Sequence, residues 1–327
     1  MTRSLKISAP ARLHVNLFDM SDLGYRQNGG IGFCVKEFDT IIEFKSSQDF
    51  EIVDKRAVGL TQTEEKALMN FLQGLYEVNN YSQKMAVVFL SGPPPHSGFG
   101  TGTASKLACA EAASIFNHVD ANQAQLVTAS GRGGTSGVGI NTYFKGGLNI
   151  DFGVTSRGLR LGPSSSRISP SQKPINLLNI KLPTEWSFGV VIPPGAHRIS
   201  AKEEVDFFNR TCPISLESVH ESIYHAVSGM ACAAVEKDYL TFCTSINAIQ
   251  KTQWKKAEWA AQTNPVRSLK IDLYDAGAQC VGLSSLGPAV YFMTPNFEEL
   301  IEKLQLSKEY IVAQCLPNNF GRELEID

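Results

Sequence analysis

The spacing of hydrophobic residues switches repeatedly between a period of two and a period near 3.6, which predicts a mixture of strands and helices. Short runs rich in strand-forming residues predict strands at 5–8, 31–35, 40–45, 50–53, 85–90, 143–152, 186–192 and 289–293. Apolar residues three and four positions apart predict helices at 63–77, 104–116, 122–130, 202–209, 218–235, 239–249 and 296–304. Strands and helices occur in both halves of the chain, which indicates an α+β protein.

The clearest alternation runs from Arg12 to Asp19. It separates two sets of side chains, with Leu13, Val15 and Leu17 on one face and Arg12, His14 and Asn16 on the other. Asp19 stands near the end of this predicted strand. The polar set forms either one wall of a ligand site or a solvated strand face, and the pattern leaves both open.

A glycine-rich turn, 97–105, connects the predicted strand at 85–90 to the helix that follows it. A strand, a glycine turn and a helix start together direct unpaired N–H groups and the positive end of the helix dipole at one point. The turn supplies both flexible backbone and hydroxyl donors, and its candidate phosphate-binding residues are Gly98, Gly100, Thr101, Gly102, Thr103 and Ser105. For a single loop of this kind, a tight turn capped by threonine is the structural alternative.

Two further glycine loops favour a binding role over a structural one. The loop 131–139 contains more glycine than a simple surface connection needs, since each glycine costs backbone entropy on folding. Its candidate binding residues are Arg132, Gly133, Gly134, Thr135 and Ser136. The loop 275–288 precedes the predicted strand at 289–293, and its candidates are Ser284, Ser285 and Gly287. Near the N-terminus, Arg26 lies beside a glycine-rich bend, where its guanidinium can pair with a carboxylate or a phosphate.

The length of 327 residues suits two domains, and the Ser-, Pro- and Gly-rich stretch 155–178 predicts a division into 1–160 and 161–327. A formal net charge of −2 gives no reason to expect nucleic acid or an anionic membrane as a partner. No apolar run is long enough to span a bilayer, and the N-terminus lacks the apolar core of a secretion signal. The seven cysteines show no metal-ligand spacing. We therefore expect a cytoplasmic protein with reduced thiols and small-molecule partners.

Three segments, in a fixed order, resemble those of the GHMP kinase superfamily, which includes galactokinase, homoserine kinase and mevalonate kinase. They are the pair Ala9-Pro10, the loop from Pro94 to Thr103, and the loop from Gly277 to Gly287. The resemblance implies a two-domain fold. Its N-terminal domain is expected to be similar to domain 2 of ribosomal protein S5, and its C-terminal domain to be ferredoxin-like.

One branch of that superfamily, the β-ribofuranosylaminobenzene 5'-phosphate synthase family, is more similar still. Its characteristic stretches resemble Ala11–Asp19, Gly131–Gly139 and Gly282–Pro288, and the Arg-Gly-Gly-Thr-Ser-Gly run that starts at Arg132 is the most specific. The resemblance implies a transferase that condenses phosphoribosyl pyrophosphate with 4-aminobenzoate or 4-hydroxybenzoate. Pyrophosphate and carbon dioxide are released, and the product serves tetrahydromethanopterin biosynthesis.

This implied chemistry requires donors for a departing pyrophosphate, together with Mg²⁺ as a cofactor. From residue type and motif position we hypothesise that Asp19 stabilises the ribose cation or ligates the metal, and that His14 moves the proton of the amine or phenol. Arg26 or Arg132 is expected to bind the benzoate carboxylate. The sequence leaves open which benzoate is used, which residues ligate the metal, and whether the chain forms a homodimer.

Two other functions fit the same loops. The first is a small-molecule kinase that uses ATP, but several superfamily kinases carry a catalytic Asp in a Ser-Gly-x-Asp pattern, which here is Ser136-Gly-Val-Gly139. Glycine cannot accept a proton from a hydroxyl, so this route of phosphoryl transfer is disfavoured. The central loop also has Thr101-Gly-Thr103 where the kinases usually carry Ser-Ser-Ala. The second alternative is a non-catalytic homologue that binds a phosphorylated metabolite.

Overall fold

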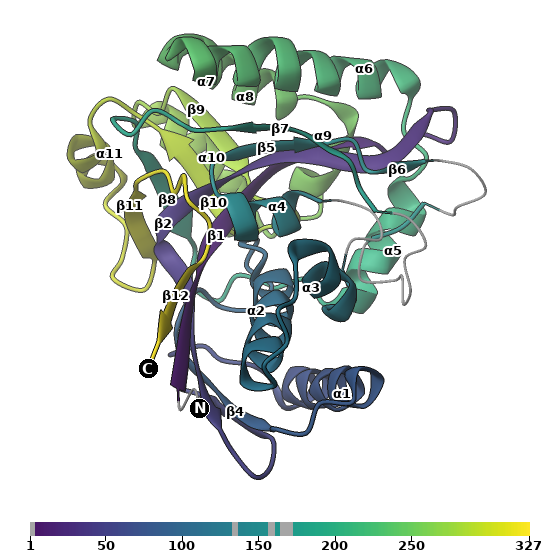
Figure 1. Cartoon of the computed structure of the whole chain (residues 1–327). Helices are drawn as coiled ribbons and strands as arrows, with labels where there is room; N and C mark the ends of the chain where they lie inside the picture. Colours follow the sequence, from purple (N-terminus) through teal and green to yellow (C-terminus); the bar gives the residue numbers. More distant parts are fainter. Residues whose placement is uncertain (1–3, 133–136, 156–160, 164–172) are drawn as a thin grey trace.

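The computed structural model describes residues 4–132, 137–155, 161–163 and 173–327. Two β-sheets form its framework, and the long strands β1 and β2 cross most of the molecule (Figure 1). The larger sheet has the strand order β12-β1-β2-β4-β3, with β5 and β6 also pairing with β2 and β7 pairing with β5. Its strands are β1 (Ser4–Asp19), β2 (Arg26–Ser46), β3 (Glu51–Asp54), β4 (Met85–Ser91), β5 (Leu148–Asp151), β6 (Val154–Thr155), β7 (Asn176–Ile180) and β12 (Glu323–Ile326). The smaller sheet has the order β11-β8-β10-β9, formed by β8 (Phe188–Ile192), β9 (Cys280–Leu283), β10 (Val290–Met293) and β11 (Ile311–Cys315).

The helices fall into two groups. Those of the first half are α1 (Gln62–Asn79), α2 (Thr101–Phe116), α3 (Gln123–Ala129) and α4 (Val138–Lys145). Those of the second half are α5 (Ala201–Thr211), α6 (Leu216–Tyr224), a π-helical segment (His225–Ala231), α7 (Cys232–Glu236), α8 (Tyr239–Ile249), α9 (Gln253–Ala260), α10 (Asn264–Asp275) and α11 (Phe297–Leu304). In the described part of the chain, none of these helices is long and apolar enough to cross a membrane.

Strand β1 contributes to two separate hydrophobic cores. Leu5 and Ile7 pack in the core under α1, α2 and α4, whereas Leu13 and Val15 pack in the core that includes the smaller sheet and α8. Strict alternation would direct all four side chains to the same side. The pairing of β1 with β2 is irregular between Ala9 and Ala11, and this irregularity lets the two halves of the strand serve different cores.

A second irregularity in β1 corrects the predicted faces. The pairing with β2 shifts again between His14 and Asn16, so the side-chain alternation changes phase there. Phe18 therefore packs in the same core as Leu13 and Val15, whereas Leu17 contacts a different cluster that contains Met20 and Trp254. The prediction that Leu17 shares a face with Leu13 was wrong, because sequence alternation carries no signal for a bulge.

Most of the predicted elements are present, with two exceptions. Residues 143–145 belong to helix α4 and not to the strand predicted from 143, and β5 begins only after the two glycines at 146 and 147. The helices α9 and α10 and the strands β6, β7, β9, β11 and β12 were not predicted, and β9 lies inside the stretch predicted as the third loop. The division at residues 160 and 161 stays a prediction, and two strands from beyond it, β7 and β12, pair within the larger sheet.

Candidate active site

Helix α2 follows the first glycine turn as predicted, but it begins at Thr101, inside the loop 97–105 and three residues before the predicted start. Its N-cap residue is Gly100, whose φ of 75° lies in the left-handed region that favours glycine. No side chain caps this end of the helix. The N–H of Thr103 already donates to the carbonyl of Gly100 at 3.0 Å, which leaves the N–H groups of Thr101 and Gly102 to an anion that the helix dipole also favours.

Strand β1 and the third glycine loop hold the first glycine loop in place. The backbone N–H of Arg12 donates to the carbonyl of Phe99 at 3.0 Å. The hydroxyl of Ser284 donates to the carbonyl of Gly98 at 2.7 Å and accepts from the backbone N–H of His14 at 2.9 Å. The backbone N–H of Ser285 then donates to the carbonyl of His14 at 3.0 Å. Two of the three predicted loops thus meet at the polar part of β1.

Two arginines face the start of α2. A Cβ atom placed on Gly100 would lie 2.9 Å from Nη2 of Arg12, and one placed on Gly102 would lie 3.5 Å from Nη2 of Arg132. Their Nε atoms are buried, and neither has a hydrogen-bond partner among the described residues. Burial, with a smaller contribution from Arg132, lowers the pKa of Arg12 to about 10, and burial also lowers the pKa of Arg132. The carboxylate of Glu204 acts on both guanidinium groups and offsets part of the effect of burial. Two partly buried cations at a helix N-terminus, each with an unpartnered Nε, are suited to bind a further anion.

A second helix starts beside the first. Helix α4 has Gly137 as its N-cap residue, again without a side-chain cap. A Cβ atom on Gly139 would lie 3.4 Å from Cγ2 of Thr103, so the first turns of α2 and α4 are in close contact. The first turn of α4 therefore has a glycine at the position where several superfamily kinases carry an aspartate. Gly133, Gly134, Thr135 and Ser136 lie outside the described residues, and their binding role stays a prediction.

His14 and Asn16 follow Arg12 along β1. The pairing shift between them puts Asn16 in phase with Phe18 and not with His14, so the prediction that all three polar side chains share one face was wrong for Asn16. The His14 ring lies over Gly30, where a Cβ atom would be 3.2 Å from Nε2, and its Nδ1 has no partner in the described chain. Burial, followed by the charges of Arg12 and Lys255, lowers the pKa of His14 well below its usual value, so the imidazole is neutral. Asn16 is fully buried, and neither atom of its amide has a partner in the described residues.

Asp19 and Arg26 lie at the other end of the β1–β2 hairpin. Seven residues separate Arg12 from Asp19, which corresponds to roughly 20 Å along a strand. Oδ1 of Asp19 accepts hydrogen bonds from the backbone N–H and the hydroxyl of Ser21, and burial raises the pKa of its carboxyl group. The guanidinium of Arg26 donates to the carbonyls of Phe152 and Gly153. These contacts stabilise the turn, and the catalytic roles expected for both residues stay predictions.

The remaining predicted residues differ in what they can offer a ligand. Thr101 and Ser105 are buried in the first two turns of α2, whereas Gly102 is exposed there. The hydroxyl proton of Ser284 is already donated to Gly98, which makes this residue a link between loops. Gly287 has a φ of 66°, and a Cβ atom there would lie 2.7 Å from Oε1 of Gln262. Its glycine is needed for the loop to pack.

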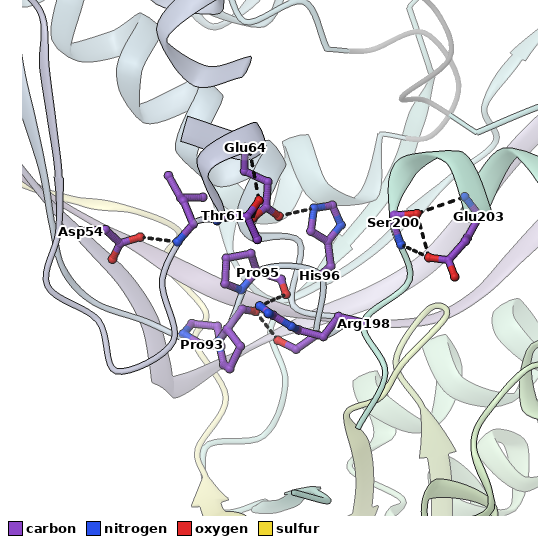
Figure 2. A network of polar contacts seen from close by, with 12 residues as sticks. Asp54, Thr61, Glu64, Pro93, Pro95, His96, Arg198, Ser200 and Glu203 are labelled. Atoms are coloured by element: carbon purple, nitrogen blue, oxygen red, sulfur yellow. Dashed lines mark hydrogen bonds and ion pairs between the residues drawn. The ribbon is translucent and has the colours of Figure 1, made fainter. Parts of the chain in front are cut away.

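The segment before the glycine loop is held from both halves of the chain (Figure 2). Arg56 and Arg198 each donate to a carbonyl in the proline run, to Pro93 and Pro95 respectively, at 3.4 Å. His96 contacts the Glu64 carboxylate at 2.9 Å. Sequence reasoning missed these contacts because Arg198 lies more than a hundred residues from its acceptor.

The described residues contain no group of three His, Cys, Asp or Glu side chains that could hold a metal ion. The charged side chains at the start of α2 are the cations Arg12 and Arg132, which suit an anion and not a metal. The described part of the site therefore does not fit a protein-bound Mg²⁺. A metal that arrives with a pyrophosphate group is compatible with it.

Comparison with known proteins identifies the family. No family model matches the chain. The β-ribofuranosylphenol 5'-phosphate synthase of Methanocaldococcus jannaschii is 31% identical over 340 residues, covering 97% of this chain and 99% of that protein. The synthase of the same name from Methanothermobacter thermautotrophicus is 30% identical over 296 residues, covering 90% of each. The chain belongs to the β-ribofuranosylphenol 5'-phosphate synthase family. This confirms the resemblance found in the glycine loops.

Solved structures confirm that the synthase family has a GHMP kinase fold. Homoserine kinase from Cytophaga hutchinsonii superposes with a TM-score of 0.66 at 16% identity, over 99% of this chain and 98% of the kinase. Mevalonate diphosphate decarboxylase from Enterococcus faecalis gives a TM-score of 0.66 at 14% identity, over the full length of both chains. A further similar structure, MDDEF with MVAPP, AMPPCP and magnesium, contains the metal (TM-score 0.67, 14% identity) and covers both chains fully. At these identities the likeness establishes the fold alone.

Proposed function

We propose that this member of the synthase family condenses phosphoribosyl pyrophosphate with 4-hydroxybenzoate or 4-aminobenzoate, and that its product enters tetrahydromethanopterin biosynthesis. The observation that supports this most is the pair of half-buried arginines, Arg12 and Arg132, whose buried Nε atoms have no partner in the described chain, at the uncapped start of α2. The second uncapped helix start, at α4, lies in contact with it. Two adjacent helix N-termini with two cations match a ligand that has two linked phosphoryl groups.

The proposed reaction breaks one carbon–oxygen bond and one carbon–carbon bond, and makes one new carbon–carbon bond. The bond between ribose C1 and the pyrophosphate oxygen breaks, and its electron pair leaves with the pyrophosphate. The ring carbon that carries the carboxylate attacks C1, and the carboxylate then departs as carbon dioxide, leaving its bonding pair to restore the aromatic ring. Arg12, Arg132 and the helix N–H groups would stabilise the charge that develops on the leaving group. Magnesium bound to the pyrophosphate would neutralise part of the same charge.

His14 and Asn16 are suited to the uncharged parts of the substrates. A neutral imidazole can accept the phenol or amine proton while the ring attacks, and return it when carbon dioxide leaves. The buried amide of Asn16 has both a donor and an acceptor to offer a hydroxyl group. Truncating either residue is expected to slow turnover more than it weakens the binding of pyrophosphate.

The proposed reaction also suggests where the enzyme acts in the cell and which molecules it binds. Both substrates are small metabolites, and the sequence has no basic surplus for nucleic acid. We place the enzyme in the cytoplasm, with a homodimer as the assembly to be tested by analytical ultracentrifugation.

The deciding experiment supplies purified protein and Mg²⁺ with phosphoribosyl pyrophosphate and carboxyl-labelled 4-hydroxybenzoate or 4-aminobenzoate. Labelled carbon dioxide that appears only with phosphoribosyl pyrophosphate supports the proposal. A parallel reaction with ATP and a panel of alcohols tests kinase activity by ADP release. ADP without labelled carbon dioxide would contradict the synthase proposal, and binding of pyrophosphate without either product would favour a non-catalytic homologue.

A further inference from the structure

Three buried side chains from outside the third glycine loop hold its backbone. The amide oxygen of Gln250 accepts from the N–H of Leu283 at 3.2 Å, and Nζ of Lys255 donates to the carbonyl of the same residue at 2.7 Å. The amide nitrogen of Gln262 donates to the carbonyl of Leu286 at 2.9 Å. The shape of this loop is therefore set by α9 and the segments that flank it, in addition to its own hairpin.

Lys255 is the charged member of this set, and its side chain is completely buried. It pairs with Glu258, one turn further along α9, which is almost fully buried as well. The other carboxylate oxygen of Glu258 accepts from the indole N–H of Trp254 at 2.8 Å. Burial lowers the pKa of Lys255. A buried ion pair is a poor source of stability compared with apolar side chains of similar size, so its position calls for another explanation.

Lys255 contacts Leu283, and the next residue along the chain, Ser284, connects the first and third glycine loops. Leu283, whose carbonyl accepts from Lys255, is followed by Ser284. The Ser284 hydroxyl bridges the backbone of His14 and the carbonyl of Gly98, at 2.9 and 2.7 Å. A shift of Leu283 would therefore move both the neutral histidine of β1 and the loop that opens α2.

We propose that Lys255, oriented by Glu258, is a positioning residue that holds the Leu283 carbonyl so that Ser284 fixes His14 and the first glycine loop relative to each other. Only the expected loss of turnover rests on the proposed function, and the positioning of the loops by Lys255 does not. Lys255 does not touch the substrate in this role. The geometry of the site depends on it because misplacement of reacting groups by about 1 Å can cost roughly 100-fold in rate.

The charge of Lys255 has a second, measurable consequence at His14. The charged groups that act on this imidazole are Arg12 from β1 and Lys255 from α9, and Glu258 pairs with the latter. Replacing the lysine by an uncharged residue removes one cation near the ring. The pKa of His14 is then expected to rise, although burial and Arg12 still keep it below the usual value.

The test compares two double variants that each neutralise one ion pair, which is fully buried in the first and partly buried in the second. Lys255→Met with Glu258→Gln removes the pair at the loop and keeps an acceptor for Trp254. Arg322→Met with Glu111→Gln is the matched control, because it removes a pair on α2 and keeps an acceptor for Tyr143. We expect turnover to fall about 10- to 100-fold in the first variant only. Lys255→Arg, which retains the charge and N–H donors, is expected to recover part of the loss.

Nuclear magnetic resonance supplies a readout that does not need turnover. Spectra of protein labelled in glycine and histidine would be recorded for the wild type and both double variants. We expect displaced Gly98 and Gly100 signals and a raised His14 pKa in the Lys255 variant alone. Unchanged turnover together with unchanged signals would overturn the proposal. Displaced signals in a protein without synthase activity would support the positioning role and contradict the proposed function instead.

Discussion

Two arginines pack against the same helix, α2, in opposite electrostatic states. Near the middle of the helix, Nη2 and Nε of Arg322 donate to the carboxylate of Glu111 at 2.6 to 3.2 Å, and Tyr143 donates to the same carboxylate at 2.7 Å. The hydrogen bond to Glu111 raises the pKa of Arg322. At the start of the helix, Arg12 faces Gly100 with an unpartnered Nε, and burial lowers its pKa to about 10.

The difference in partners indicates that Arg322 has a structural role and that Arg12 has a role in binding. Nε and Nη2 of Arg322 both donate to a carboxylate, so its charge contributes to the attachment of the C-terminal segment to α2. Arg12 and Arg132 carry a desolvation cost that the charge of Glu204 offsets only in part, and their Nε atoms have no acceptor in the described chain. A folded chain retains such groups where a ligand supplies the missing partner. The comparison therefore supports the proposed anion site at the start of α2 and distinguishes it from a structural ion pair further along the helix.

The largest effect is expected from removing the cations at the start of α2. Arg12→Met and Arg132→Met should each lower kcat/KM for phosphoribosyl pyrophosphate by about 100-fold or more, because each loses a charged contact to the leaving group. Stability should be unchanged or higher, since a buried unpaired charge disappears. Steady-state kinetics and urea unfolding measure the two effects. Full activity in either variant would show that the anion binds elsewhere.

A smaller effect is expected from adding one methyl group at the same place. Gly100→Ala introduces a Cβ that would lie 2.9 Å from Arg12, at a φ of 75°, so it strains the backbone and displaces the guanidinium. Gly195→Ala at a φ of 61° is the control, because a Cβ there meets nothing within 4 Å. Both variants should lose about 1 kcal/mol of stability. Turnover should fall about tenfold in Gly100→Ala only, and equal activities would contradict the placement of Arg12.

Arg322→Met tests the structural ion pair near the middle of α2. This variant leaves Glu111 buried without its cation, and the free energy of unfolding should fall by about 2 kcal/mol. The turnover of the folded protein should be close to that of the wild type, because the pair lies away from the start of the helix. Adding Glu111→Gln should recover part of the stability. A large loss of turnover without a loss of stability would remove the distinction between the two arginines.

The smallest effect concerns Asp39, a half-buried carboxylate that forms no ion pair with the described residues. Burial raises the pKa of its carboxyl group to about 6, and its Oδ1 has no partner among the described residues. The folded state therefore binds this proton more tightly than the unfolded state. Its contribution to stability is present below about pH 4 and is lost as pH rises through about 6.

Asp39→Asn should remove this dependence. The variant should match the wild type near pH 4 and exceed its stability at pH 8, as measured by urea unfolding at both values. The titration of His14 is common to both proteins and cancels in the difference. A variant that is less stable than the wild type at pH 8 would indicate that the carboxylate is stabilised by a cation after all.

The sequence by itself determined the features that depend on local pattern. The glycine loop at 97–105, the helix it opens, the polar residues Arg12, His14 and Asn16, and the family all follow from residue types at close spacing. Glycine preferences and helix periodicity act over a few residues, so one segment is enough to reveal them.

Only the tertiary structure decided which polar residues are partnered. The bulge after His14 changed the faces assigned to Leu17 and Asn16, because it arises from pairing with β2. Arg26 was expected to bind a carboxylate, but its guanidinium donates to carbonyls more than a hundred residues away. Lys255 belongs to no recognisable sequence motif. It is connected to the site by its hydrogen bond to Leu283 and by the contact of Ser284 with His14. Such contacts join segments that are distant in sequence, and the physical cost of a buried charge depends on neighbours that no local pattern contains.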